Sequence, residues 1–274
     1  MLRLQNRIID WALVGGTLAF ILFLYVPILT LVLFSFADSR VLTFPIEGMT
    51  LHWYAQLFQN PNFYNALKSS LILALITMIL STILGTGSAL AWMRLNFPFK
   101  RALQALSFLP ILFPQLLLGV MMLLWFSVLR NFIAVPMGMI TLVIGHVIYA
   151  TPFVLVVVSV QVHGFDAAIE DAARDAGASE WQVLTRITLP ILRPAIVAGM
   201  ILAFLLSWGN FYLSYSLNGS SQTLPIFIFS GIAVGSSPIY PAIATLNFLA
   251  ALVLVVIAEK MRRKATRRLA GTES

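Results

Sequence analysis

Uncharged apolar runs of membrane-spanning length recur along the chain and constrain its fold more than any other feature. A helix needs roughly 20 apolar residues to cross the hydrocarbon core of a bilayer. Six runs come close to or exceed that length, and none of them contains Asp, Glu, Lys or Arg. They cover residues 11–36, 69–93, 103–129, 139–160, 194–217 and 240–258. The sequence therefore predicts an all-α integral membrane protein with about six transmembrane helices, forming one domain over residues 1–274.

The composition excludes several other classes of protein. Hydrophobic residues make up 60% of the chain and charged residues 10%, which is too little charge to cover the surface of a soluble domain. The absence of cysteine excludes a disulfide framework and a thiol nucleophile. The net charge of +7 fits a membrane surface better than nucleic acid, because the basic residues lie between and beyond the apolar runs.

The distribution of Lys and Arg predicts the orientation. Six crossings with an internal N-terminus place 14 of the 17 basic residues inside, as the positive-inside rule requires. These 14 are Arg3, Arg7, Arg94, Lys100, Arg101, Arg174, Arg186, Arg193, Lys260, Arg262, Arg263, Lys264, Arg267 and Arg268. A seventh crossing at the short apolar segment 224–234 would place the last six of these basic residues outside the cell. We therefore expect both termini in the cytoplasm and a re-entrant or interfacial segment at 224–234.

Half of the ten acidic residues lie in the predicted cytoplasmic loop 164–190, between the fourth and fifth runs, so this loop must be exposed to water. Its local signals predict two short helices. Asp166 suits the N-cap of the first, Glu170 and Arg174 have the favourable i,i+4 order, and Gly177 suits the left-handed residue after its end.

The second helix of the loop has its own start signal. Ser179 and Gln182 have the spacing of a capping box. We expect Pro190 and Pro194 to close the loop and to begin the fifth span. Small residues on the first helix, Ala172 and Ala176 among them, suit close approach to a groove in another protein. A solvated helix without a partner is equally compatible with these residues.

The same loop resembles a known motif. Asp171-Ala172-Ala173, Gly177, Ile187 and Leu189-Pro190 have the spacing of the Glu-Ala-Ala loop of type I ABC-importer permeases, with Asp171 in place of the usual glutamate. The rest of the chain is similar to the shorter permease subunit of the polyamine-type importers, which have the MetI-like fold. The landmarks are Ser35-Phe36, His52-Trp53-Tyr54, Gly164-Phe165-Asp166, Leu224-Pro225, Gly235, Ser237-Pro238, Ala242 and Ala244-Thr245.

This resemblance implies a transport mechanism in which the chemistry belongs to other subunits. The chain would be a permease in a bacterial inner membrane, paired with a second permease, favoured as a sister chain. Two ATPase subunits would bind the loop and use the ATP, an extracytoplasmic binding protein would deliver the solute, and this chain would hold no cofactor, metal or nucleic acid. The residues to which the resemblance gives the ATPase-coupling role are Glu170, Asp171, Ala172, Ala173, Asp175, Ala176, Gly177, Ala178 and Ser179.

The resemblance leaves the class of solute open among polyamine-like compounds, opines, aminophosphonates and related small polar molecules. The fifth span of polyamine carriers bears an acidic pair where this chain has Gly209-Asn210, which argues against a polycation. A polar and aromatic group in this span, Trp208, Asn210, Tyr212 and Tyr215, predicts a face lining the solute path. An interfacial aromatic belt is the alternative.

Other residues within the spans suggest structural roles. His146 is the only histidine in a span, and we interpret it as a hydrogen-bonded structural residue rather than a ligand or proton relay. Pro110, Pro114 and Pro152 predict helix kinks, and Gly85 permits close helix contact.

Two other classes of function remain alternatives. An ion-coupled secondary transporter or channel usually carries a charged residue within its spans, and the six runs have none. A membrane-embedded enzyme needs a catalytic constellation at membrane depth, and the sequence shows none. These absences favour the importer permease.

Overall fold

The computed structural model describes residues 2–46, 48–133, 136–235 and 237–253, with side chains described from Asp10 onward. The chain divides into two compact units, Met1–Pro61 with Ile228–Ser274 and Asn62–Phe227. We call them unit 1 and unit 2 and describe each by itself, so the single domain over residues 1–274 stays a prediction. Within the described residues the structure is helical, and the only β pairing is an isolated bridge between Ala37 and Met49.

Unit 1 contains α1 (Leu2–Phe34), α2 (His52–Phe58) and an apolar helix over Ile239–Val253. The segment after α1 is tied to α2 by two side-chain hydrogen bonds. The Ser35 and Tyr54 hydroxyl oxygens are 2.7 Å apart, and the Trp53 indole N–H donates to the Ala37 carbonyl over 2.7 Å. The two sequence landmarks after the first predicted span are therefore in contact.

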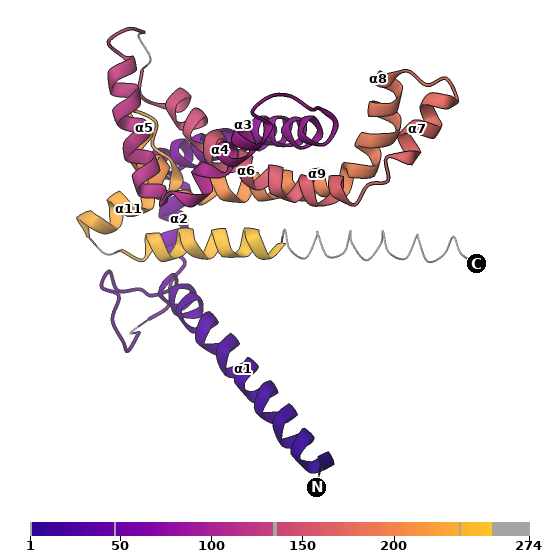
Figure 1. The fold of residues 1–274 in the computed structure, drawn as a ribbon. Helices are drawn as coiled ribbons and strands as arrows, with labels where there is room; N and C mark the ends of the chain where they lie inside the picture. Colours follow the sequence, from indigo (N-terminus) through magenta and orange to yellow (C-terminus); the bar gives the residue numbers. More distant parts are fainter. Residues whose placement is uncertain (1, 47, 134–135, 236, 254–274) are drawn as a thin grey trace. The chain divides into compact units, whose positions relative to one another are not determined.

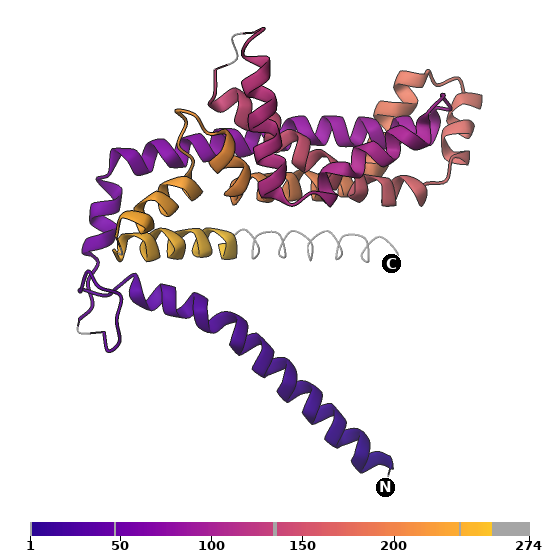
Figure 2. The ribbon, with the colours of Figure 1, turned by 60° about the vertical axis from the view of Figure 1, so that its left-hand side comes forward.

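Unit 2 contains most of the helices (Figures 1 and 2). In chain order they are α3 (Pro61–Arg94), α4 (Lys100–Leu112), α5 (Gln115–Leu129), α6 (Met139–His163), α7 (Ala168–Asp175), α8 (Glu180–Val183), the π-helical turn η1 (Leu184–Thr188), α9 (Leu189–Trp208), α10 (Tyr212–Leu217) and the start of α11 (Leu224–Val234). Both figures show α7 and α8 as a hairpin at one end of this unit.

Close packing against α6 holds the long helices of unit 2 together. A Cβ atom at Gly85 in α3 would lie 2.8 Å from the Cβ of Val154, and one at Gly199 in α9 would lie 3.0 Å from its Cγ1. Val154 is fully buried. Glycine therefore lets α3 and α9 both approach α6 closely at the same valine, as small residues do in membrane bundles.

The predicted spans correspond to helices of adequate length in several cases. Among the described residues, four helices are long and apolar enough to cross a membrane, and a fifth crossing results if α4 and α5 count as one span. They confirm a multi-pass α-helical membrane protein, with the count of six only approximate. The sixth predicted span, 240–258, is helical to Val253, and its last five residues lie outside the described range.

The third predicted span, 103–129, is wrong as one continuous helix. α4 and α5 meet at an angle of 109°, and the break lies at Phe113 and Pro114, both of which have extended backbone. Proline disfavours the helical conformation in the residue before it, which explains why α4 ends there. Pro110 and Pro152, in contrast, lie inside helices that continue past them.

The fifth predicted span, 194–217, is wrong at both ends. A continuous helix runs over Glu180–Trp208, so it begins inside the predicted loop, and Pro190 and Pro194 do not start it. The π turn η1 widens the helix just before Pro190, which occupies the first turn of α9, where proline is tolerated. The helix then stops at Trp208, and α10 begins only at Tyr212.

The helix α11 has 11 residues. At 1.5 Å per residue it is too short to cross a bilayer. The prediction that segment 224–234 is not a seventh crossing is therefore confirmed by its length.

Candidate functional site

The segment of residues 166–183, which we call the charged hairpin, folds through the local signals that the sequence carries. The N-cap of α7 is Ala167 rather than the predicted Asp166, but the Asp166 carboxylate, one residue earlier, accepts a hydrogen bond from the Ala168 backbone N–H over 3.0 Å. At its end Gly177 has φ +87°, and the Ala178 N–H donates to the Ala173 carbonyl over 3.0 Å. This is a Schellman ending, which favours glycine in the left-handed position.

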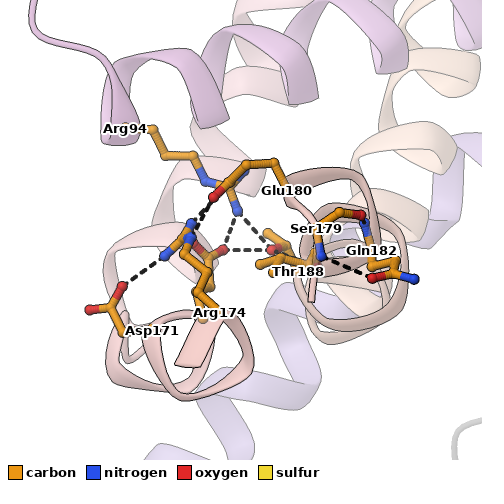
Figure 3. Close-up of polar contacts among 9 residues, drawn as sticks. Arg94, Asp171, Arg174, Ser179, Glu180, Gln182 and Thr188 are labelled. Atoms are coloured by element: carbon orange, nitrogen blue, oxygen red, sulfur yellow. Dashed lines mark hydrogen bonds and ion pairs between the residues drawn. The ribbon is translucent and has the colours of Figure 1, made fainter. Parts of the chain in front are cut away.

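The start of α8 confirms the predicted capping box. The Gln182 backbone N–H donates to the Ser179 hydroxyl over 3.3 Å, and the Ser179 N–H donates to the Gln182 side-chain oxygen over 2.9 Å (Figure 3). Both bonds satisfy backbone N–H groups that the start of a helix would otherwise leave unpaired.

Arg174 holds the two helices of the charged hairpin together. Its guanidinium donates to the Asp171 carboxylate over 2.7 Å and to the Glu180 carboxylate over 2.6 Å (Figure 3). A third contact, to Glu170 over 3.3 Å, confirms the predicted i,i+4 pair. The planar guanidinium can serve several carboxylates at once because it carries five N–H donors.

Glu170 attaches the charged hairpin to the rest of unit 2. Only 4% of this residue is exposed, and its carboxylate is ion-paired with Arg94, the last residue of α3. The Thr188 hydroxyl in η1 donates to the same carboxylate over 2.5 Å and accepts from Arg94 over 2.7 Å. One carboxylate thus joins α3, α7 and η1.

The surroundings of Glu170 keep it ionised. Burial on its own would raise the pKa of this carboxyl group. The hydrogen bonds from Thr188 and Arg94 and the charge of Arg94 act in the opposite direction, and the pKa of Glu170 is lowered from its ordinary value of 4.5. The ion pair therefore persists through the neutral range.

The structure divides the residues predicted to couple to an ATPase into three groups by their exposure. Glu170 points inward and is buried, so it is not available to a partner. Ala173 and Ala178 are partly buried, whereas the other six are exposed: Asp171, Ala172, Asp175, Ala176, Gly177 and Ser179.

Two large apolar side chains lie beside this exposed group. Ile169 is 46% exposed and Trp181 is 71% exposed. Sequence reasoning did not select either residue. Large exposed apolar side chains next to small ones are typical of a surface that a partner covers.

Sequence reasoning also missed Arg94 and Thr188 as site residues. Arg94 was recognised only as a basic residue at a span end, 76 positions before Glu170. A carboxylate in a short amphipathic helix and an arginine at a neighbouring span end are complementary, but nothing in the sequence pairs them. No local signal identifies Thr188.

The four residues of the predicted solute path do not share one helix. Trp208 is the last residue of α9, and Tyr212 is the first of α10, so they are not on one continuous helical face. Tyr212 and Tyr215 are 48% and 54% exposed. Asn210 is buried, and its side-chain oxygen accepts from the Leu213 N–H over 3.1 Å, which caps α10. The role of this group in a solute path stays a prediction.

His146 lies among hydroxyl groups, as its interpretation as a hydrogen-bonded residue requires. Its two ring nitrogens contact the Ser207 hydroxyl at 2.8 Å and the Ser214 hydroxyl at 3.2 Å. Within the described residues, no three His, Asp or Glu side chains are grouped so that they could hold a metal ion.

Apolar helices of spanning length and a water-exposed helical hairpin define a multi-pass α-helical membrane protein. Comparison with known proteins agrees. The chain belongs to the family described as binding-protein-dependent transport system inner membrane component, whose profile matches residues 81–270. It is therefore a permease of a binding-protein-dependent importer, and this family is one of transporters rather than enzymes.

Several relatives with similar sequences are polyamine permeases. The chain is 33% identical to the spermidine/putrescine transport system permease protein PotC of Escherichia coli K12, over 94% of this chain and 96% of the relative. It is 35% identical to the putrescine transport system permease protein PotI of the same organism, over 86% of this chain and 85% of the relative.

Solved structures of importers share the fold. A chain of a bacterial alginate ABC transporter, in complex with an alginate-bound periplasmic protein, aligns with a TM-score of 0.77 at 20% identity and covers 96% of both chains. A chain of the MetNI methionine ABC transporter aligns with a TM-score of 0.61 at 14% identity, over 79% of this chain and 99% of that chain. The predicted MetI-like fold is therefore confirmed.

Proposed function

We propose that the charged hairpin docks on a separate ATPase subunit in the cytoplasm and transmits the ATP-driven motion of that subunit to the apolar helices. The observation that carries this proposal is the combination of an exposed, small-faced helix with a buried attachment. Ala172 and Ala176 leave room for a partner groove, and Ile169 and Trp181 offer apolar anchors beside it. Glu170, on the inner side, fixes the same helix to Arg94.

The complete transporter would contain subunits that this chain does not supply. A second permease, favoured as a sister chain, would complete the membrane part, and two ATPase subunits would each receive one hairpin. A solute-binding protein outside the membrane would deliver the solute, and ATP would be used only by the ATPases. In this arrangement both termini of the chain would lie in the cytoplasm, as the distribution of Lys and Arg predicts.

The solute would be a small polar organic molecule. The similarity to the permeases PotC and PotI favours polyamines. Gly209 and Asn210 provide no negative charge in the fifth span, and the oxygen of Asn210 is already engaged with the Leu213 N–H. We therefore extend the proposed range beyond polyamines to opines, aminophosphonates and related solutes.

Co-purification tests the docking role. An affinity-tagged chain, expressed in its native operon context and extracted in mild detergent, should retain a nucleotide hydrolase. Gly177→Leu should abolish this retention or uncouple ATP hydrolysis from uptake, because a branched side chain at φ +87° distorts the end of α7. Gly16→Leu is the matched control, since Gly16 has open space around it. Full coupling in Gly177→Leu would contradict the proposal.

The apolar anchors can be tested without disturbing the backbone of the hairpin. Trp181→Ser should weaken retention of the hydrolase by about tenfold or more, as expected for an exposed aromatic that becomes buried in an interface. The chain itself should insert normally, because Trp181 is 71% exposed.

A reporter fused after Ser274 provides the independent test of orientation and should be active only in the cytoplasm.

A further inference from the structure

A chain of hydrogen bonds centred on His146 crosses unit 2 at a place that the docking role does not involve. His146 is in α6 and only 1% exposed. Its Nδ1 lies 2.8 Å from the Ser207 hydroxyl oxygen, and its Nε2 lies 3.2 Å from that of Ser214. Ser207 in turn donates to the Thr77 hydroxyl of α3 over 3.3 Å. We call these four residues the His146 cluster.

The hydrogen bonds of the cluster run in one direction. A serine hydroxyl has a single proton, and Ser207 uses it toward Thr77. With this donor direction Ser207 accepts from His146, and the tautomer that fits has the proton of the neutral imidazole on Nδ1. Nε2 is then the acceptor and receives the proton of the Ser214 hydroxyl. Every polar atom of the imidazole is thus satisfied inside an apolar helix bundle, where an unsatisfied one would be costly.

The two serines lie on opposite sides of the break in the fifth predicted span. Ser207 is in the last turn of α9, and Ser214 is in the first turn of α10. The intervening residues 209–211 do not form helix. A Cβ at Gly209 would meet no atom within 4 Å, so close packing does not fix the backbone at that residue. The imidazole therefore bridges the two helices across the break, in addition to the hydrogen bond by which Asn210 caps α10.

The far side of α10 carries exposed aromatic side chains. Tyr212 and Tyr215 are about half exposed, and Phe211 packs against both rings, with centroid distances of 5.6 and 5.4 Å. Ser214 and Leu217, on the other side of α10, are buried. The direction in which the aromatic side faces thus depends on the angle between α9 and α10, and the bridge links these two helices directly.

We propose that His146 is a positioning residue for transport that holds α10 at a fixed angle to α9 through Ser214 and Ser207. This inference rests on the proposed function only in its transport consequence, because the bridge itself is a property of this chain. His146 neither binds solute nor carries protons in this role. Its contribution is to keep the broken helix in one arrangement while the bundle moves.

The absence of cysteine from the chain gives a direct test. Spin labels are introduced at Leu205 in α9 and Tyr215 in α10, both exposed, and the distance between them is measured by pulsed electron paramagnetic resonance in lipid nanodiscs. The unmodified bridge should give one narrow distance distribution. His146→Phe removes both hydrogen bonds, so the population ratio of the bridged to other arrangements should fall about tenfold and a second distance should appear.

Conservative variants separate positioning from simple packing. His146→Gln keeps a donor and an acceptor, and it should restore most of the narrow distribution, which a purely steric role would not predict. Ser214→Ala removes only the link to α10 and should broaden the distribution even if His146→Phe fails to fold. Ser216→Ala is the matched control, because Ser216 is in the same helix but bonds to the Tyr212 carbonyl instead of to His146.

The outcomes are distinguishable from failure of the docking role. The distance measurement needs no ATPase, so a chain that retains no hydrolase could still show the His146 effect. Ser214→Ala with a distribution identical to that of Ser216→Ala would overturn the positioning role. In the co-purified complex, His146→Phe should keep the hydrolase bound and lower uptake several-fold, with recovery in His146→Gln. Unchanged uptake in His146→Phe would also overturn it.

Discussion

The charged hairpin and the His146 cluster both fix one helix against another, but they do so with opposite chemistry. The hairpin uses an ion pair between Arg94 and Glu170 that lies next to water. The side chain of Arg94 is 26% exposed, so this arginine remains partly solvated. The cluster uses neutral imidazole and hydroxyl groups within an apolar bundle, where a charge would be expensive. Each joint therefore uses the chemistry that its own surroundings favour: an ion pair where the side chains reach water, and neutral hydrogen bonds where they do not.

The two joints also differ in how they are satisfied. The Glu170 carboxylate receives hydrogen bonds from three residues on three elements, namely Arg94, Thr188 and Arg174. The imidazole of His146 has two partners and no spare capacity. We therefore expect the hairpin to depend on charge and pH, and the cluster to depend on the presence of each hydroxyl.

The largest effect should come from Arg94→Met. Removal of the guanidinium leaves the buried Glu170 without its main counter-charge, and the free energy of unfolding should fall by about 2 kcal/mol. The loss is smaller than for a fully buried pair because Thr188 and Arg174 remain. Thermal unfolding in detergent measures it, and Arg101→Met, at an exposed position of α4, is the control. Equal stability of Arg94→Met and Arg101→Met would show that the ion pair between Arg94 and Glu170 does not stabilise the protein.

A smaller effect should follow from acidification. The pKa of Glu170 is lower in the folded protein than its ordinary value of 4.5, so its contribution to stability is complete above pH 4.5 and is lost as the pH falls through the lowered pKa. The loss is smaller than in Arg94→Met because a protonated carboxyl can still hydrogen-bond to Thr188.

Hydrogen exchange measured as a function of pH tests this difference between the two regions. After correction for the intrinsic exchange rate, amides of α7 should lose protection below pH 4.5, and those of Glu170→Gln should show a much flatter profile. Parallel loss in α10 and α7 at the same pH would mean that the protein unfolds as a whole, and the comparison would then fail.

In the region of the His146 cluster, Asn210→Ala should lower the stability of α10 by about 1 kcal/mol. The side chain of Asn210 caps α10 by accepting from the Leu213 N–H over 3.1 Å, and loss of such a cap costs about 1 kcal/mol. Exchange of the amides in 212–217 should increase by about fivefold. Asn131→Ala, an exposed position after α5, should leave these amides unchanged. Normal protection in Asn210→Ala would show that the bridge alone holds α10.

The smallest effect should come from Ser179→Ala in the charged hairpin. The capping box at the start of α8 is lost, but the pair of Arg174 with Glu180 still holds this helix. We expect a destabilisation of about 0.5 kcal/mol, at the low end for a lost cap, seen as faster exchange in 180–183. Ser220→Ala is an exposed control. A larger effect than that of Asn210→Ala would reverse the expected order of the two regions.

The sequence predicted the hairpin well because its signals act over a few residues. Asp166, Gly177 and the pair Ser179 and Gln182 each determine a helix end through bonds to backbone groups no more than three positions away, or through one backbone angle. Such signals do not depend on the rest of the fold. The ion pair of Glu170 with Arg174 is of the same kind, since it spans one helical turn.

The predictions failed where helix continuity depended on the surroundings. Pro190 was expected to start the fifth span. Instead, the π turn η1 lies directly before Pro190, and one continuous helix runs from α8 into α9. Uncharged residues continue through 209–211, so hydropathy gave no sign of the break there. Pro114 predicted a kink within one helix, but it did not predict that the helix breaks there with a bend of 109°.

By itself, the sequence determined the membrane-spanning character of the chain, the ends of the hairpin helices and the family motif, because each depends on the identity and spacing of neighbouring residues. Only the tertiary structure decided that Glu170 is buried against Arg94, 76 positions away, and that His146 joins two serines across a helix break. Burial and pairing between distant residues depend on where packing places each side chain, and no local pattern encodes that.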